Sequence, residues 1–472
     1  MAFGNLFFVL SFLPVSLILY YLIPKQFPMV RNVLLVLVSL LFYSWGNPQY
    51  LILILFSVFY NYFAALQMSA FGEAGEKKKR KIVLIANVAV NLLLLGFFKY
   101  FGFLLANING IFGSNFKAAA LPLPIGISFY TFSVLSYIFD VYYEKCEVQT
   151  NPILCALYVT LFPKLVSGPI VAYRDIESQL RKRKVSMAGF GAGVNLFLIG
   201  LGKKVLLADN LSIPFTAISS MADRSVMTAW LGMICYSLEL YFDFSGYSDM
   251  AIGLAKMFGF SFQKNFNYPY LADSVSDFWR RWHISLGGWF RNYVYIPMGG
   301  NRCSAGRQFL NLATVWLLTG LWHGASWTFI IWGIWHGFFV ISEKFLLGGF
   351  LQKVPRPLRI ALTVLEAFLG WVWFFSPSLS YALTYFGQLI GRGGAGFTDT
   401  AFFYYLASNA LLLLLAIICC GPIPARLQRK YIYRSESTAV RLLSVAAYLL
   451  MLVLCIAYLV NNTYSSFLYF QF

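Results

Sequence analysis

Twelve long apolar segments divide this chain, and they restrict its fold more than any other feature of the sequence. A helix needs about 20 consecutive apolar residues to cross a bilayer. The segments lie at residues 4–24, 32–47, 49–69, 83–105, 122–143, 188–208, 225–256, 308–325, 327–347, 360–377, 402–420 and 442–460. The sequence therefore predicts an all-α polytopic membrane protein, in which residues 1–472 form a single membrane-embedded domain.

The composition agrees with this fold class. Hydrophobic residues make up 59% of the chain and charged residues 11%, against about 45–50% and about 25% in a typical soluble protein. Lys and Arg number 36 against 18 Asp and Glu, a net charge of +18. The basic residues lie in short loops between apolar segments, so we expect anionic lipid headgroups of the bilayer as their partners, and not nucleic acid.

Basic loops predict the orientation in the membrane, because Lys and Arg concentrate on the cytoplasmic side. These loops contain Lys25 and Arg31; residues 77–81; residues 181–184; Lys353, Arg356 and Arg359; and Arg426, Arg429, Lys430 and Arg434. All of them face the cytoplasm only if residues 153–172 and 278–298 enter the membrane and return without crossing it. Non-helical backbone at membrane depth is tolerated where protein or water surrounds it. Both termini are then extracytoplasmic.

All three histidines of the chain, His283, His323 and His336, lie within 54 residues of one another. Imidazole is the only side chain whose unperturbed pKa is near neutrality, so the clustering suggests acid–base catalysis. His323, between Trp322 and Gly324, is the candidate general base, and His336 on the next helix would support it. His283, in a basic and aromatic stretch, is suited to holding an anionic donor. Each histidine could instead pack structurally against a neighbouring helix.

Two acidic residues, Glu239 and Asp243, lie four residues apart within an apolar segment. Ionised groups are costly at the bilayer centre, so both should face the protein interior. They could pair with Lys99, Lys164 or the arginines of residues 278–298. Structural pairing and catalysis are alternative roles for them. The three histidines lack the His-Glu-x-x-His spacing of a zinc hydrolase, so no metal site is predicted.

Five motifs in order along the chain resemble those of the membrane-bound O-acyltransferase family. They are Leu-Pro-Leu-Pro-Ile-Gly-Ile-Ser-Phe-Tyr-Thr-Phe (121–132), Phe-Pro-Lys-Leu-Val-Ser-Gly-Pro-Ile (162–170), Tyr-Phe-Asp-Phe-Ser-Gly-Tyr-Ser-Asp (241–249), Phe-Trp-Arg-Arg-Trp-His (278–283) and Leu-Trp-His-Gly (321–324). The resemblance is to the branch that O-acetylates bacterial alginate and peptidoglycan, to which the teichoic acid D-alanyl transferase is related.

The resemblance implies a ring of about 11–12 transmembrane helices around a funnel, with re-entrant segments and a catalytic core at about residues 119–347. It places His323 at a tunnel through the funnel floor and makes His283 the second histidine of the family. The donor would be a cytoplasmic acyl thioester such as acetyl-coenzyme A, a substrate and not a tightly bound cofactor. Its binding residues would be Arg280, Arg281, Trp282 and Arg291.

The last residues, Phe-Leu-Tyr-Phe-Gln-Phe (467–472), resemble a tail found in envelope acyltransferase systems. By that resemblance, the tail 461–472 is an acyl relay in which Tyr469 takes the acyl group and passes it to an extracytoplasmic acyltransferase of esterase-like fold. An aromatic anchor at the membrane interface is the alternative interpretation.

The predicted function is O-acetylation of a cell-envelope polysaccharide, alginate-like or peptidoglycan, by a multi-pass protein of the bacterial cytoplasmic membrane. One alternative is D-alanyl transfer to teichoic acid from a carrier protein. Another is a proton-coupled transporter or flippase, in which the intramembrane acids and histidines would relay protons.

Overall fold

The structure is a computed structural model that describes residues 3–117, 122–393, 395–433 and 435–461. Within these ranges the regular structure is helical, without strands. The chain forms two compact units. Unit 1 comprises Met1–Phe197 and Ser248–Lys264, and unit 2 comprises Leu198–Tyr247 and Asn265–Phe472.

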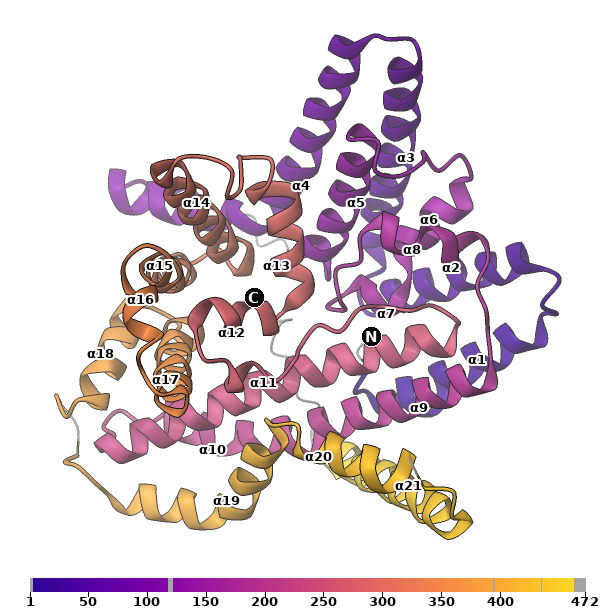
Figure 1. Cartoon of the computed structure of the whole chain (residues 1–472). Helices are drawn as coiled ribbons and strands as arrows, with labels where there is room; N and C mark the ends of the chain where they lie inside the picture. Colours follow the sequence, from indigo (N-terminus) through magenta and orange to yellow (C-terminus); the bar gives the residue numbers. More distant parts are fainter. Residues whose placement is uncertain (1–2, 118–121, 394, 434, 462–472) are drawn as a thin grey trace. The chain divides into compact units, whose positions relative to one another are not determined.

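Unit 1 contains most of the helices of the N-terminal half (Figure 1). They are α1 (Leu13–Leu22), α2 (Pro28–Ser44), α3 (Leu51–Glu73), α4 (Lys77–Phe112), α5 (Ile127–Tyr142), α6 (Pro152–Thr160), α7 (Phe162–Leu165), α8 (Tyr173–Arg181), most of α9 (Met187–Gly202) and the end of α11 (Val226–Met257). Helices α3 and α4 form an antiparallel hairpin (Figure 1). Phe8, Phe42 and Phe162 are fully buried, and the ring of Phe8 packs edge to face against the other two.

Unit 2 contains the segment with the three histidines. Its further helices are α10 (Asp209–Ser219), α12 (Val275–Arg281), α13 (Ile284–Phe290), α14 (Ala305–His323), α15 (Trp327–Ser342), α16 (Gly348–Leu351), α17 (Arg356–Phe375), α18 (Leu379–Leu389), α19 (Thr400–Cys419), α20 (Ile423–Leu427) and α21 (Thr438–Asn461). Helices α14 and α15 touch at Gly320 and Gly333. A Cβ atom on either glycine would lie 2.5 Å from a backbone oxygen of the other helix, so only glycine allows this close approach.

The predicted fold class is confirmed: the chain is a multi-pass membrane protein. Each of the twelve predicted segments contains a helix, and among the described residues seven helical stretches are long and apolar enough to cross a membrane. The seven are Pro48–Glu73, Lys77–Phe112, Met187–Ser219, Trp327–Leu351, Arg356–Phe375, Thr400–Cys419 and Thr438–Asn461. Helices α5 and α11 are not among them and are buried almost all round. A helix surrounded by protein does not need an apolar surface, so its sequence can be more polar.

The two segments predicted not to cross the membrane are broken in the structure. Helix α6 ends at Thr160, α7 has four residues, and no helix follows until Tyr173. In the second segment, α12 and α13 are separated by Trp282 and His283. The backbone of His283 has φ 44°, in the left-handed region that non-glycine residues rarely adopt, which redirects the chain sharply there.

Candidate functional site

His323 is the last residue of α14, and its side chain is buried among aromatic rings. The ring centroids of Trp332 and Phe374 lie 4.6 and 5.2 Å from the centroid of the imidazole. Gly324 ends the helix, and a Cβ atom there would collide with the ring of Phe329. These rings bury the imidazole and shield it from bulk water.

His336 lies on α15, where it is fully buried and pairs with an acid from α17. Its Nδ1 atom lies 2.7 Å from Oε1 of Glu366. Its Nε2 atom has no hydrogen-bond partner in the described part of the chain. Gly370 of α17 packs against this side of the ring, since a Cβ atom on Gly370 would lie 2.5 Å from Nε2. The pair therefore joins α15 to α17.

Trp332 connects the two histidine environments, because its ring contacts both imidazoles. Its centroid is 4.6 Å from that of His323 and 4.9 Å from that of His336. From the sequence, His336 was expected to support His323 from the next helix. In the structure both imidazoles contact the same indole ring, that of Trp332.

His283 lies between α12 and α13, and its side chain is buried. Its Nδ1 atom is 3.2 Å from Oδ1 of Asn265, and the ring of Phe244 packs edge-on at 4.6 Å. Burial lowers the pKa of His283 well below its usual range, so the imidazole is neutral at physiological pH. The ring of Trp322 lies 6.0 Å from His283 and 5.1 Å from His323, which makes one indole the neighbour of both.

The acid Asp243 pairs with a residue that the sequence analysis did not consider. Lys204, in the π-helical turn Lys203–Ala208 that follows α9, has its Nζ atom 2.7 Å from Asp243 and 2.7 Å from Asp209. The prediction that Asp243 pairs with Lys99, Lys164 or the arginines of residues 278–298 was wrong. Glu239 lies one turn before Asp243 on the same helix and is buried, as predicted.

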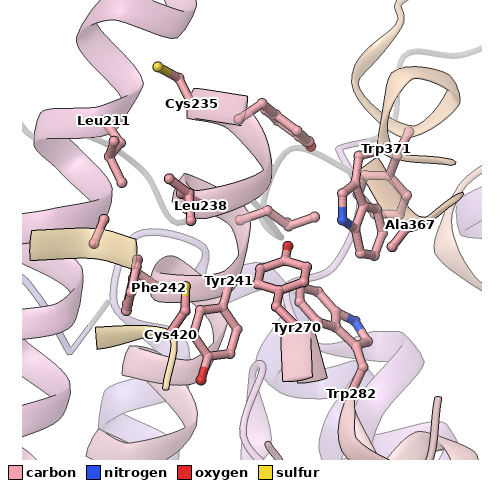
Figure 2. Packing of buried hydrophobic residues seen from close by; sticks show 14 of the residues in the cluster. Leu211, Cys235, Leu238, Tyr241, Phe242, Tyr270, Trp282, Ala367, Trp371 and Cys420 are labelled. Atoms are coloured by element: carbon pink, nitrogen blue, oxygen red, sulfur yellow. The ribbon is translucent and has the colours of Figure 1, made fainter. Parts of the chain in front are cut away.

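The predicted donor-binding residues differ in exposure. The side chain of Arg280 is 70% exposed, while Arg281 holds Asp277 through a 2.7 Å contact, and Arg291 is exposed. Trp282 is instead buried in the core of unit 2, where Figure 2 shows it near Tyr241 and Tyr270. Arg280 and Arg291 are therefore exposed to solvent, whereas the Trp282 ring is part of the core.

Sequence reasoning missed Glu366 and Lys204. Glu366 is the one acid in the apolar segment 360–377, a signal that could have been used, since an acid within a span needs a buried partner. Lys204 follows Lys203 near the end of an apolar segment, which resembles an ordinary interfacial basic pair. Tyr469 and the tail 462–472 lie outside the described residues.

The sequence matches the membrane-bound O-acyltransferase family over residues 143–388. It is 42% identical to the probable alginate O-acetylase of Pseudomonas aeruginosa, over 81% of this chain and 73% of that protein. This chain belongs to the membrane-bound O-acyltransferase family. The matched range includes all three histidines, Asp243 and Glu366, so the site described above lies within the family domain.

Two further relatives of this O-acyltransferase have different acceptors in their names. The peptidoglycan O-acetyltransferase of Helicobacter pylori is 36% identical over 83% of this chain and 80% of that protein. The teichoic acid D-alanyltransferase of Bacillus subtilis is 28% identical over 47% of this chain and 59% of that protein. The predicted family resemblance is confirmed, and family membership favours an acyltransferase over the transporter alternative.

Proposed function

We propose that this O-acyltransferase moves an acetyl group from a cytoplasmic thioester, such as acetyl-coenzyme A, to a hydroxyl group of a cell-envelope polysaccharide. The observation that carries the proposal is the imidazole of His323, held among Trp332, Phe374 and Phe329 within the family domain. The names of the alginate and peptidoglycan relatives support acetyl as the acyl group and an envelope polysaccharide as the acceptor.

In the proposed first step, the phenolic oxygen of Tyr469 forms a bond to the thioester carbonyl carbon, and the carbon–sulfur bond breaks. His323 takes the phenolic proton during the attack and returns it to the departing thiolate, so no other reactant is needed. The acyl group then passes from this ester to the polysaccharide hydroxyl through the partner described below. A positioned base typically accelerates such a step by about 10²–10⁴. The exposed arginines Arg280 and Arg291 would hold the anionic part of the donor.

The sidedness follows from where the reactants occur. Thioesters are made in the cytoplasm and polysaccharide hydroxyls lie outside the bacterial cytoplasmic membrane, so the acyl group has to cross the bilayer through a dry path. We place both termini on the extracytoplasmic side, where the tail with Tyr469 would meet the acyl group. From there, a partner acyltransferase of esterase-like fold would complete transfer to the polymer.

The test uses protein purified in detergent with radiolabelled acetyl-coenzyme A, and it measures thioester cleavage and transfer of the label to the protein. We expect His323→Asn to lose both by at least a hundredfold, and Ser408→Ala, an exposed change on α19, to retain both. A carrier-protein thioester of D-alanine serves as the second donor. If only that donor is turned over, the protein is a D-alanyl transferase and not an acetyltransferase. Full activity of His323→Asn would exclude His323 as the base.

A further inference from the structure

Glu343 lies at the start of the π-helical turn Glu343–Leu347, directly after α15, and its carboxylate contacts the first turn of α12. Its Oε1 atom accepts a 2.6 Å hydrogen bond from the backbone N–H of Val275. Its Oε2 atom accepts 2.9 Å hydrogen bonds from both the backbone N–H and the hydroxyl of Ser276. One acidic side chain thus satisfies two of the N–H groups that every helix leaves without an intrahelical acceptor.

The next residue, Lys344, contacts the chain on the other side of His283. Its Nζ atom donates a 2.7 Å hydrogen bond to Oδ1 of Asn301 and lies 3.4 Å from the hydroxyl of Tyr295. We define residues 275–302 as the basic segment, since it contains the predicted donor-binding arginines. Two consecutive residues of one turn therefore hold the basic segment near its beginning and near its end.

We propose that Glu343 is a positioning residue that holds the basic segment in place for the acyl donor. Lys344 makes a second, weaker contact with the same segment. This proposal rests on the proposed function, because it takes residues 275–302 as the donor site. Glu343 itself touches neither reacting group. It acts through α12, whose last turn carries Arg280 and Arg281.

Helix α12 is short. A helix of seven residues is too short to be stable alone, because helix nucleation is costly and such helices depend on external contacts. A carboxylate at the N-terminus is favourable because it complements the partial positive charge of the helix end. Glu343 supplies this charge from a different helix, so it fixes the position of α12 in unit 2 as well as its helical state.

Other contacts limit how much Glu343 contributes. Ser274 caps α12 from within the chain through the N–H of Asp277, and Arg359 holds Asp273 at 3.1 Å just before the helix. Helix α12 should therefore persist when the Glu343 carboxylate is lost, but with a less defined position. We expect weaker donor binding with an intact protein, and not a loss of folding.

The kinetic test compares Glu343→Gln with Glu436→Gln, which changes an exposed acid elsewhere in unit 2. Glutamine keeps the size and one acceptor oxygen but removes the charge. We expect KM for the acetyl thioester to rise about tenfold in Glu343→Gln, since a hydrogen bond to a charged group contributes roughly the free energy of a tenfold change. We expect kcat to stay within about twofold because His323 is untouched. A fall in kcat at unchanged KM would overturn the proposal.

A second measurement does not depend on activity, so it separates failure of this proposal from failure of the proposed function. Trypsin cleaves after exposed arginines, and Arg280 is exposed but protected by its place in α12. We expect faster cleavage after Arg280 in Glu343→Gln and in Ser276→Ala, with the double variant adding little to either. Wild-type cleavage rates in both variants would overturn the proposal. Faster cleavage with an unchanged KM would also overturn it, because α12 would then not serve the donor.

Discussion

The Nδ1 nitrogen of His336 and the carboxylate of Glu366 lie 2.7 Å apart, with both side chains buried between α15 and α17. With Nδ1 protonated, the imidazole donates this hydrogen bond and the carboxylate oxygen accepts it. Trp332, in contact with the His336 ring, also packs against His323. The pair therefore fixes one wall of the aromatic environment around the candidate base.

Substitution of Glu366 should show how much this hydrogen bond contributes to the stability of the folded protein. Glu366→Ala leaves the buried Nδ1–H group without an acceptor, which costs about 1–3 kcal/mol of stability. Glu366→Gln retains an amide oxygen that can accept from Nδ1–H, and we expect it to be less destabilised than the alanine variant. Thermal unfolding in detergent measures both. Equal stability of the two variants would contradict the role of the acceptor.

Gly370→Ala should displace His336. The added Cβ atom would lie 2.5 Å from Nε2 and Cε1 of the imidazole, so the ring or α17 must move. Overpacking of this kind costs about 1–3 kcal/mol, and acyl transfer should fall as the Trp332 wall shifts. Gly96→Ala on α4 is the matched control, since no atom lies within 4 Å of its added Cβ. A Gly370→Ala variant as stable as the wild type would be inconsistent with this packing.

Asp399 should make part of the stability depend on pH. Burial raises the pKa of its carboxyl, but hydrogen bonds from Thr228 and from the backbone N–H groups of Phe402 and Ser225 outweigh it, so the pKa is lowered. A carboxyl with a lowered pKa in the folded state stabilises above its unfolded pKa, and this stabilisation disappears as the pH falls through the folded pKa. The stability difference between wild type and Asp399→Ala should therefore be largest at neutral pH and shrink below about pH 4. A difference that is independent of pH would contradict the assignment.

Tyr469→Phe tests the acyl relay. The change removes only the phenolic hydroxyl, so an aromatic anchor would be preserved, while a covalent carrier would be lost. We expect polysaccharide acetylation in cells to fall as far as in His323→Ala, with normal amounts of protein in the membrane. Near-normal acetylation would leave the tail as an anchor and require direct transfer from the thioester.

The orientation is testable with single added cysteines and a membrane-impermeant maleimide applied to intact cells. Cysteine at Asp223 or Ser378 should be labelled, and cysteine at Lys79 or Arg429 should be labelled only after permeabilisation, as the basic loops require. Labelling of the unsubstituted chain is the control for the native cysteines, all of which are buried or partly buried. External labelling at position 429 would reverse the predicted side of this loop.

The fold class and the histidine cluster were predictable from local sequence, since apolar segment length and residue type are enough for both. Pairing was not. Asp243 has several basic residues within reach in the sequence, and only the fold selects Lys204, which the π-helical turn after α9 brings to it. Likewise, His336 and Glu366 are 30 residues apart in the sequence, and their contact depends on how α15 packs against α17.

Apolar length alone also failed to distinguish helices exposed to lipid from those enclosed by protein. Helix α21 has a mean hydropathy of 2.6 and is almost wholly exposed in the structure. Helix α11 is longer, with 32 residues against 24, but carries Glu239 and Asp243 within a buried surface. The polar residues were the better signal there, because they are tolerated only where protein surrounds them.

The order in which unit 1 is assembled follows from its discontinuous chain. Its first 197 residues pack against residues 248–264: the Tyr20 hydroxyl donates to the backbone oxygen of Phe258, and Gly193 packs against Gly253. A ribosome adds about 5–20 residues per second, so residues 248–264 are made several seconds after the first 197 residues. During synthesis, the packing of unit 1 therefore cannot be completed until Lys264 has been added, after the first residues of unit 2.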